Sequence, residues 1–391
     1  MKVLFVCSHQ IQNLIPLFVE LNKKKDFNFK VIYWEKLTSF HYDEEFKQQI
    51  DFNINFYRNY DFVSLSKEKN STKSFFSFFN KIRISINLIK YFFKNDFNTV
   101  IFYGYYFPHV ISAILLKILG KKTVLRSVSY NLGKRNLLKK VIRYFYYRLS
   151  NLFFDEFWSI CKLNTDFFLS FGVKKEKIFL IPSSQITKEF IFNENEKFLL
   201  NNEKIVEDNK LSKNKKFILF AGKFNSQKRP LFLINSFINA QLGNEWNLIL
   251  SGGGGIFHDD VLKFINKNNL SNVSFVGYKN LREMIGLYTI SDIVVLPSDY
   301  GETHGNVLME AIQFECALIA SDRTGIYPEI LKEQMGLVFK AAYKSDLIEK
   351  FKLLTKDKEL LLKLKKNGIK YSDKIKPLYA ANKMSELLIK K

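Results

Sequence analysis

The sequence predicts an α/β protein built on parallel sheets and divided into two domains. Its 391 residues exceed what one ordinary hydrophobic core accommodates, so two domains are expected. Near the start, apolar runs at residues 2–7 and 29–34 flank a helical pattern at 16–24, which is typical of a βαβ unit. A second unit of strand, loop, helix and strand covers residues 293–320.

Between these units, apolar runs and helical periodicity alternate along the chain. Helices of the first domain, residues 1–190, are expected at 75–97, 111–119 and 137–154. Its further strands are expected at 99–103, 123–126, 157–160 and 178–181. Residues 193–216 are polar and lack a periodic stripe, so we expect a linker with an irregular insertion at 191–216.

The second domain is expected at residues 217–370, and a last helix lies in a tail at 371–391. Its strands are expected at 218–221, 247–251, 273–276, 293–296, 317–320 and 336–339. Its helices are expected at 230–240, 281–288, 306–314 and 345–366, with the last helix of the chain at 377–390.

The composition is strongly basic, with 60 Lys and Arg against 38 Asp and Glu and a net charge of +22. Such a charge favours an anionic partner. Charge alone does not show whether that partner is a membrane, a nucleic acid or a phosphorylated ligand. No apolar run approaches a membrane span, and the first residues lack a signal peptide, so a cytoplasmic protein is expected. Cys7, Cys161 and Cys316 are odd in number and scattered, which argues against a disulfide framework or a metal cage.

Two of the expected helices, 75–97 and 137–154, are both aromatic and basic. The second could lie on an anionic membrane surface, with aromatic residues at the interface and cations near head groups. Alternatively, its apolar stripe packs on the sheet and its lysines face water. Both interpretations remain open here. No recognisable nucleic-acid-binding motif accompanies the basic residues, so nucleic acid is not expected as a partner.

The late βαβ unit carries one candidate binding site. The strand at 293–296 ends at Pro297-Ser298, and a loop through Gly305 leads into the next helix. The amides of Gly305, Asn306 and Val307 open that helix, and such amides bind anions readily. Glu302 in the loop and Glu310 in the helix could contact two parts of one ligand, although on spacing alone both are ordinary surface residues.

A second candidate segment follows the first strand of the second domain. Gly222 and Lys223 directly follow that strand, and Lys228 precedes the next helix. Two ammonium groups at such a position would offset the cost of desolvating a diphosphate.

These segments together resemble the retaining nucleotide-sugar glycosyltransferases of family 4, which have a GT-B fold of two Rossmann-like, doubly wound domains facing a central cleft. The resemblance is carried by the segment from Gly222 to Lys228, by the Glu302 and Glu310 pair, and by Ser321-Asp322-x-x-Gly325. It implies transfer of a sugar from a UDP- or GDP-linked donor to an acceptor hydroxyl with the anomeric configuration retained. It also implies that the last helix packs back on the first domain.

The resemblance implies a role for each site residue. Glu302 and Lys228 would be catalytic, Lys223 and Lys228 would clamp the diphosphate with the helix amides, and Glu310 would bind the ribose. The loop at Gly277 and Tyr278 would lie beside the base. No Asp-x-Asp motif is found, which is consistent with an enzyme that needs neither a metal nor another cofactor.

The first-domain half of this site departs from the family pattern. Relatives often place a His after the strand at 123–126, where this chain reads Ser127-Val128-Ser129. Either Arg126 and the serines serve the acceptor side, or His109 or His9 contributes from a neighbouring loop. His9 could equally be a loop residue without a role. His304 stands where many relatives have an aromatic residue, and it either fills that space or touches the acceptor.

The expected acceptor is a glycan or lipid-linked precursor of a bacterial surface polysaccharide. Two alternatives remain: a nucleotide-sugar epimerase with the same fold, and a non-catalytic basic protein that binds membrane or RNA. Incubation with the donor alone would identify an epimerase, and binding that collapses with salt would identify the basic protein.

Overall fold

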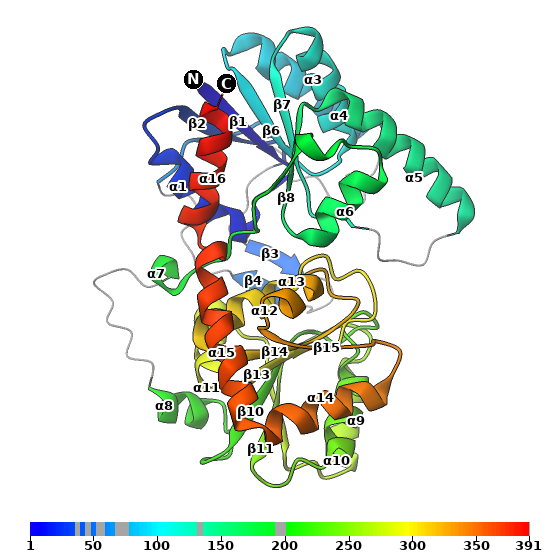
Figure 1. Cartoon of the computed structure of the whole chain (residues 1–391), viewed down its shortest axis with the longest axis vertical. Helices are drawn as coiled ribbons and strands as arrows, with labels where there is room; N and C mark the ends of the chain where they lie inside the picture. The colour runs from blue at the N-terminus through cyan, green and yellow to red at the C-terminus, as the bar shows by residue number, and fades with distance from the viewer. Residues whose placement is uncertain are drawn as a thin grey trace. The chain divides into compact units, whose positions relative to one another are not determined.

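The computed structural model describes residues 1–35, 40–43, 48–51, 59–66, 78–130, 136–191 and 201–390 (Figure 1). The chain forms two compact units. Unit 1 comprises Met1–Thr38, Asn55–Ser184 and Lys376–Lys391, and unit 2 comprises Ser39–Ile54 and Gln185–Ile375. Each unit contains a parallel sheet with helices, which confirms the predicted α/β class.

The sheet of unit 1 has seven parallel strands in the order β5-β2-β1-β6-β7-β8-β9. The strands are β1 (Lys2–Cys7), β2 (Asn28–Tyr33), β5 (Phe62–Ser64), β6 (Thr99–Tyr103), β7 (Lys122–Arg126), β8 (Glu156–Ser159) and β9 (Ile178–Leu180). The strand order reverses between β1 and β6, and such a switch point leaves a crevice at the carboxyl edge of an open sheet.

Helices cover the sheet of unit 1 and bury its apolar strands (Figure 1). They are α1 (Ile15–Asn22), α3 (Phe78–Lys94), α4 (Phe107–Ile118), α5 (Leu137–Ser150), α6 (Lys162–Ser170) and the C-terminal α16 (Pro377–Ile389), with short 3₁₀ turns that include η2 (Asn151–Phe153). Helix α16 packs beside α1, where Lys24 Nζ donates to Asn382 Oδ1. The last helix of the chain therefore belongs to unit 1.

The main sheet of unit 2 has six parallel strands in the order β12-β11-β10-β13-β14-β15. The strands are β10 (Lys216–Lys223), β11 (Trp246–Gly253), β12 (Val273–Gly277), β13 (Ile293–Leu296), β14 (Ala317–Ser321) and β15 (Gly336–Phe339). Unit 2 also includes a two-stranded antiparallel sheet, β3 (Phe40–Asp43) with β4 (Gln48–Asp51), which the sequence did not predict.

The helices of unit 2 connect successive strands of this sheet, precede β10 or follow β15. They are α7 (Lys188–Ile191), α8 (Asn202–Asp208), α9 (Pro230–Ala240), α10 (His258–Lys267), α11 (Leu281–Ile290), α12 (Asn306–Ala311), α13 (Tyr327–Lys332), α14 (Lys344–Lys356) and α15 (Lys358–Ser372). Phe237 of α9 and Phe351 of α14 meet edge to face in the same cluster as the strand residues Ile218 and Leu248, which are fully buried.

Three expectations differ from the structure. Part of the stretch predicted to be irregular is helix α8, which Asn201 caps by accepting from Lys204 N; residues 192–200 of that stretch lie outside the described residues. The helix predicted at 345–366 is two helices, because Asp357 is extended and its carboxylate caps α15 by accepting from Leu360 N at 2.8 Å. The apolar stripe of α5 faces outward, so the interpretation that packs this stripe on the sheet is wrong.

No helix within the described residues is sufficiently long and apolar to span a bilayer.

A close approach between the ends of β10 and β11 requires glycine. Gly252 has φ +115°, and a Cβ built on it would lie 2.1 Å from the carbonyl oxygen of Gly222. The backbone of Gly222 cannot move out of the way as the end of a flexible side chain can. The two strand ends therefore stay close together only while residue 252 has no side chain.

We expect Gly252→Ala to lower the melting temperature by more than Gly243→Ala does. Gly243 also has positive φ, at +75°, but nothing lies within 4 Å of its added Cβ. The control therefore measures backbone strain alone, about 1 kcal/mol, whereas the clash at Gly252 adds to it. Thermal unfolding followed by circular dichroism tests this, and equal shifts for the two variants would contradict the close approach.

Candidate functional site

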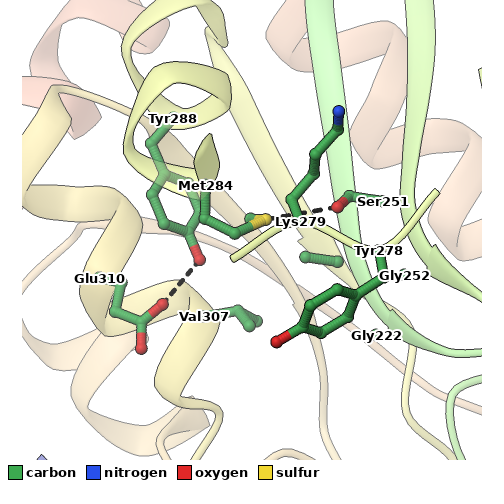
Figure 2. Close-up of a pocket in the computed structure, with 10 residues that line it drawn as sticks. Gly222, Ser251, Gly252, Tyr278, Lys279, Met284, Tyr288, Val307 and Glu310 are labelled. Carbon is green, nitrogen blue, oxygen red and sulfur yellow. Dashed lines mark hydrogen bonds between the residues drawn. The ribbon is translucent and has the colours of Figure 1, made fainter. Parts of the chain in front are cut away.

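A pocket of about 170 Å³ lies at the carboxyl edge of the unit 2 sheet (Figure 2). It is lined by Ala221, Gly222, Ser251, Gly252, Tyr278, Lys279, Met284, Tyr288, Val307 and Glu310. These residues come from the ends of β10 and β11, from the loop after β12, and from helices α11 and α12. Four of the predicted site residues, Gly222, Tyr278, Val307 and Glu310, thus lie around one space.

Lys228 lies directly beside this pocket. A Cβ built on Gly222 would be 3.5 Å from Lys228 Cγ, so the lysine stem passes over that glycine. The backbone amide of Lys228 donates to Asn225 Oδ1 at 3.0 Å, which fixes the loop between β10 and α9.

The ammonium group of Lys228 pairs with the carboxylate of Glu302. Ser298 Oγ also donates to Glu302 Oε2, at 3.3 Å. The side chains of Lys228 and Glu302 are only 18% and 12% exposed, so the pair is largely shielded from water. The structure therefore brings together two residues that are 74 positions apart and that the sequence assigned to one reaction centre.

The Glu302 loop is held by the segment that follows β14. Gly325 N donates to the Glu302 carbonyl oxygen at 2.9 Å, and Ser321 Oγ donates to the Ser298 carbonyl oxygen at 2.5 Å. A Cβ on Gly325 would lie 2.0 Å from Thr303 O, so only glycine fits there. The Ser-Asp-x-x-Gly pattern thus has a structural meaning: it anchors the loop that presents Glu302.

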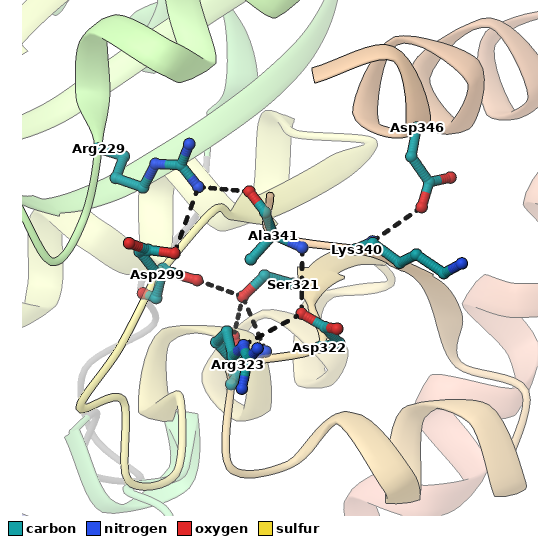
Figure 3. A network of polar contacts seen from close by, with 10 residues as sticks. Arg229, Asp299, Ser321, Asp322, Arg323, Lys340, Ala341 and Asp346 are labelled. Carbon is teal, nitrogen blue, oxygen red and sulfur yellow. Dashed lines mark hydrogen bonds and ion pairs between the residues drawn. The ribbon is translucent and has the colours of Figure 1, made fainter. Parts of the chain in front are cut away.

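The same segment is tied to the end of β15, and that end is tied to the start of α9 (Figure 3). Asp322 Oδ1 accepts from Ala341 N at 3.0 Å, which joins the ends of β14 and β15. Arg229 donates to Ala341 O at 2.6 Å and lies 3.8 Å from the Asp299 carboxylate. Burial lowers the pKa of Arg229, while Asp299 opposes that shift. This polar network fixes the start of α9 against both loops.

Glu310 is oriented by a buried tyrosine that the sequence analysis did not single out. Tyr288 of α11 donates its hydroxyl to Glu310 Oε2 at 2.8 Å (Figure 2). Its ring stacks on Phe314, with the ring centres 5.9 Å apart, and is almost fully buried. Burial raises the pKa of Glu310, and the hydrogen bond from Tyr288 opposes this rise. Tyr288 thus favours the ionised carboxylate, which can accept hydrogen bonds from a ligand.

The other predicted residues of unit 2 border this region. Lys223 ends β10 opposite Gly253, and Gly305 begins α12 with φ +87°. Asn306 is exposed; its Oδ1 lies 3.2 Å from His304 Nδ1 and 3.4 Å from Gln185 Nε2. His304 is buried, which agrees with the interpretation that it fills the space of an aromatic residue.

His109 of unit 1 is a structural residue. It is completely buried; Nδ1 lies 2.9 Å from Gly104 O, and Nε2 lies 3.0 Å from the indole Nε1 of Trp34. The indole can only donate, so Nε2 accepts and Nδ1 carries the proton. Burial lowers the pKa of His109 to about 4. Both ring nitrogens are therefore engaged, and this geometry gives no support to an acceptor-binding role.

Arg126 and His9 differ in their surroundings. Arg126 is fully buried and donates to Ile181 O at 3.0 Å and Pro182 O at 3.2 Å, so its guanidinium anchors the end of the unit 1 sheet. Burial lowers its pKa to about 10. His9 is exposed at the end of β1, with Nδ1 2.7 Å from Ser8 Oγ. Of these two residues, only His9 can meet a ligand from solution.

Sequence reasoning missed Tyr288, Met284, Ser251 and Lys279 among the pocket residues. The spacing of Met284 and Tyr288 places both on one face of α11, and a buried tyrosine usually has a hydrogen-bond partner, but the sequence gives no indication of which one. Within the described part of the chain, no group of three or more His, Cys, Asp or Glu side chains could hold a metal ion.

Comparison with known proteins adds to this geometry. Residues 201–371 match the family model of glycosyl transferases group 1. An uncharacterized glycosyltransferase from Methanocaldococcus jannaschii is 29% identical over 40% of this chain and 43% of its own length. The N,N'-diacetylbacillosaminyl-diphospho-undecaprenol alpha-1,3-N-acetylgalactosaminyltransferase of Campylobacter jejuni is 29% identical over 60% of each chain. The chain thus spans about half the length of these relatives.

The solved structures show the fold of the whole chain. HepE from Anabaena, in complex with UDP, superposes with a TM-score of 0.69 over 99% of both chains at 14% identity. At that identity the likeness concerns the fold alone. The predicted GT-B fold is confirmed, and it consists of the two Rossmann-like units described above.

The buried, neutral His109 predicts a pH-dependent stability. Its pKa of about 4 lies below the ordinary value of 6.5, so the unfolded chain binds a proton first as the pH falls. The stability that depends on neutral His109 is complete above pH 6.5 and is lost between 6.5 and 4. Over this window we expect the wild type to lose up to about 3 kcal/mol more unfolding free energy than His109→Gln. Urea titrations at several pH values measure the difference, and parallel curves would contradict it.

Proposed function

We propose that this protein is a retaining glycosyltransferase of family 4, because residues 201–371 match the model of glycosyl transferases group 1 and the chain has the GT-B fold. It would move a hexose-type sugar from a nucleotide diphosphate-sugar to an acceptor hydroxyl. The observation that carries the proposal is the Lys228–Glu302 pair, which lies beside the pocket containing Glu310.

The pocket geometry supports one placement of the donor. Glu310, oriented by Tyr288, would accept hydrogen bonds from the ribose hydroxyls, and Tyr278 would border the base. The diphosphate would then extend along Gly222 toward Lys228, and the sugar would reach Glu302. The related Anabaena structure contains UDP, which supports a nucleotide donor.

The chemistry expected of this arrangement is positioning and charge stabilisation. The Lys228 ammonium, with Lys223 and the amides at the start of α12, would stabilise the negative charge that grows on the departing diphosphate. Glu302 holds that ammonium in place and would contact the sugar near the reacting carbon. The lysines would supply positive charge that a divalent ion supplies in other enzymes, so the proposed reaction needs no metal.

The proposed acceptor is a glycan or a lipid-linked precursor. The Campylobacter relative is named for transfer to a sugar on diphospho-undecaprenol, which supports a lipid-linked acceptor. Such a substrate would place the protein in the cytoplasm, at the inner face of the membrane.

We expect Lys228→Ala to lower kcat by at least about a hundredfold, because stabilisation of the leaving group is lost in the transition state. The donor is first identified by screening nucleotide-sugars for thermal stabilisation, and turnover is then followed as nucleotide release. Lys352→Ala serves as the control, since Lys352 is an exposed lysine on α14 in the same unit. Unchanged turnover in Lys228→Ala would refute the assignment. Nuclear magnetic resonance of the product tests retention, and conversion of the donor without an acceptor would instead identify an epimerase.

Tyr288→Phe should weaken nucleotide binding about tenfold, because Glu310 loses a hydrogen bond to its charged form. Isothermal titration with UDP and GDP measures the affinity. Tyr33→Phe is the matched control: Tyr33 is also buried, and its hydroxyl lies 3.1 Å from that of Tyr60 in unit 1. If both variants bound the nucleotide as the wild type does, Tyr288 would have no part in donor binding.

A further inference from the structure

Helix α5 of unit 1 exposes its apolar face to solvent. The outward side chains are Leu137, Leu138, Val141, Ile142, Phe145 and Leu149. Each is between 45% and 78% exposed, and they lie within one side of the helix at its 3.6-residue period. We call these six residues the α5 face. A surface helix of a globular protein normally has the opposite orientation, with its apolar side inward.

The inward side of α5 packs against unit 1 through aromatic and polar contacts. The Tyr147 ring packs on Phe167 and Phe171, with ring centres about 5 Å apart. Tyr146 donates its hydroxyl to Tyr105 O at 3.3 Å, and Ser150 is buried. These contacts fix the rotation of the helix. The α5 face therefore cannot turn inward without breaking an aromatic cluster.

The apolar surface continues beyond the helix. Leu152 in η2 is 62% exposed, and its carbonyl oxygen accepts from Lys117 Nζ at 2.8 Å. Lys117 lies near the end of α4, next to Ile118, which is 77% exposed. Together with the α5 face, these residues expose an apolar area of the kind that marks an interaction site.

The charge along α5 itself has a single sign. From Leu137 to Leu152 the chain contains Lys139, Lys140, Arg143 and Arg148 and no acidic residue. Lys139, Lys140 and Arg148 are exposed. A second copy of this chain packed on the same face would bring these cations against their own equivalents, which disfavours self-association. A bilayer with acidic head groups instead offers both an apolar interior and negative charge.

We propose that the α5 face docks unit 1 on an anionic lipid bilayer, with its aliphatic side chains and Phe145 at the acyl boundary and its cations among the head groups. In this role α5 lies in the plane of the interface. The purpose of this docking rests on the proposed function, because a lipid-linked acceptor would be presented at such a surface.

Sedimentation with vesicles tests the proposal on the full-length chain. We expect binding to vesicles of phosphatidylcholine with one-third phosphatidylglycerol, and weak binding to phosphatidylcholine alone. Ile142→Asp combined with Phe145→Asp should weaken binding at least tenfold. The matched control is Ile256→Asp combined with Leu362→Asp, because both residues are exposed apolar residues of unit 2. Lys139→Glu combined with Lys140→Glu should also release the protein, and added salt should reduce wild-type binding.

Three results would overturn the proposal. They are failure of the wild type to bind vesicles at all, equal binding of the wild type to neutral and acidic vesicles, and binding by the variant with both Ile142→Asp and Phe145→Asp that is as strong as that of the wild type. A concentration-dependent dimer that this variant abolishes, or RNA binding without vesicle binding, would assign the face to another partner. Release of nucleotide from a soluble donor should be unchanged in the variant. That measurement separates failure of membrane docking from failure of the proposed transferase function.

Discussion

The candidate site depends on how the loop containing Glu302 is held. This loop lies between β13 and α12, outside the hydrogen-bond ladder of the sheet, so its position has to come from other contacts. The segment after β14 supplies them: Gly325 N binds the Glu302 carbonyl oxygen, and Ser321 Oγ binds the Ser298 carbonyl oxygen. Buried polar backbone groups need such partners. The contacts that satisfy the loop also bring the Glu302 carboxylate to Lys228.

The ion pair between Lys228 and Glu302 has a second consequence. In a place largely shielded from water, an ion pair costs less free energy than either of its charges would cost without the other. The pair can therefore keep a cation ready beside the pocket before any anionic ligand arrives. Ser298 adds a hydrogen bond to the same carboxylate oxygen, which holds the pair on the side of β13. Binding of a diphosphate would then change the partners of an ammonium group that is already in position.

Much of the fold of unit 2 could be predicted because its signals are local. The apolar runs that became β10 and β13 end at glycine or proline, and the helical stripes follow after loops. The break at Asp357 was missed because the helical stripe runs through it, whereas the side-chain cap decides where the second helix starts. Tyr288 was missed because its partner, Glu310, is 22 residues away and belongs to a different helix.

Helix α5 shows a different limit of prediction from the sequence. Periodicity predicts that a helix has two unlike sides, but it does not say which side is buried. Here the aromatic side carrying Tyr146 and Tyr147 is drawn into the cluster of Tyr105, Phe167 and Phe171, because aromatic rings bury large areas and their hydroxyls find partners there. The aliphatic side is then left outward.

The two units thus place their polar chemistry differently. In unit 1, the charged and polar groups His109 and Arg126 are buried and bind backbone oxygens or an indole, so they stabilise the sheet edge. In unit 2, the equivalent edge keeps Lys228, Glu302 and Glu310 beside a pocket. A residue type found at a strand end is therefore not sufficient to assign a function. What distinguishes a site is that its polar groups are oriented by neighbours and still border open space, as Tyr288 orients Glu310.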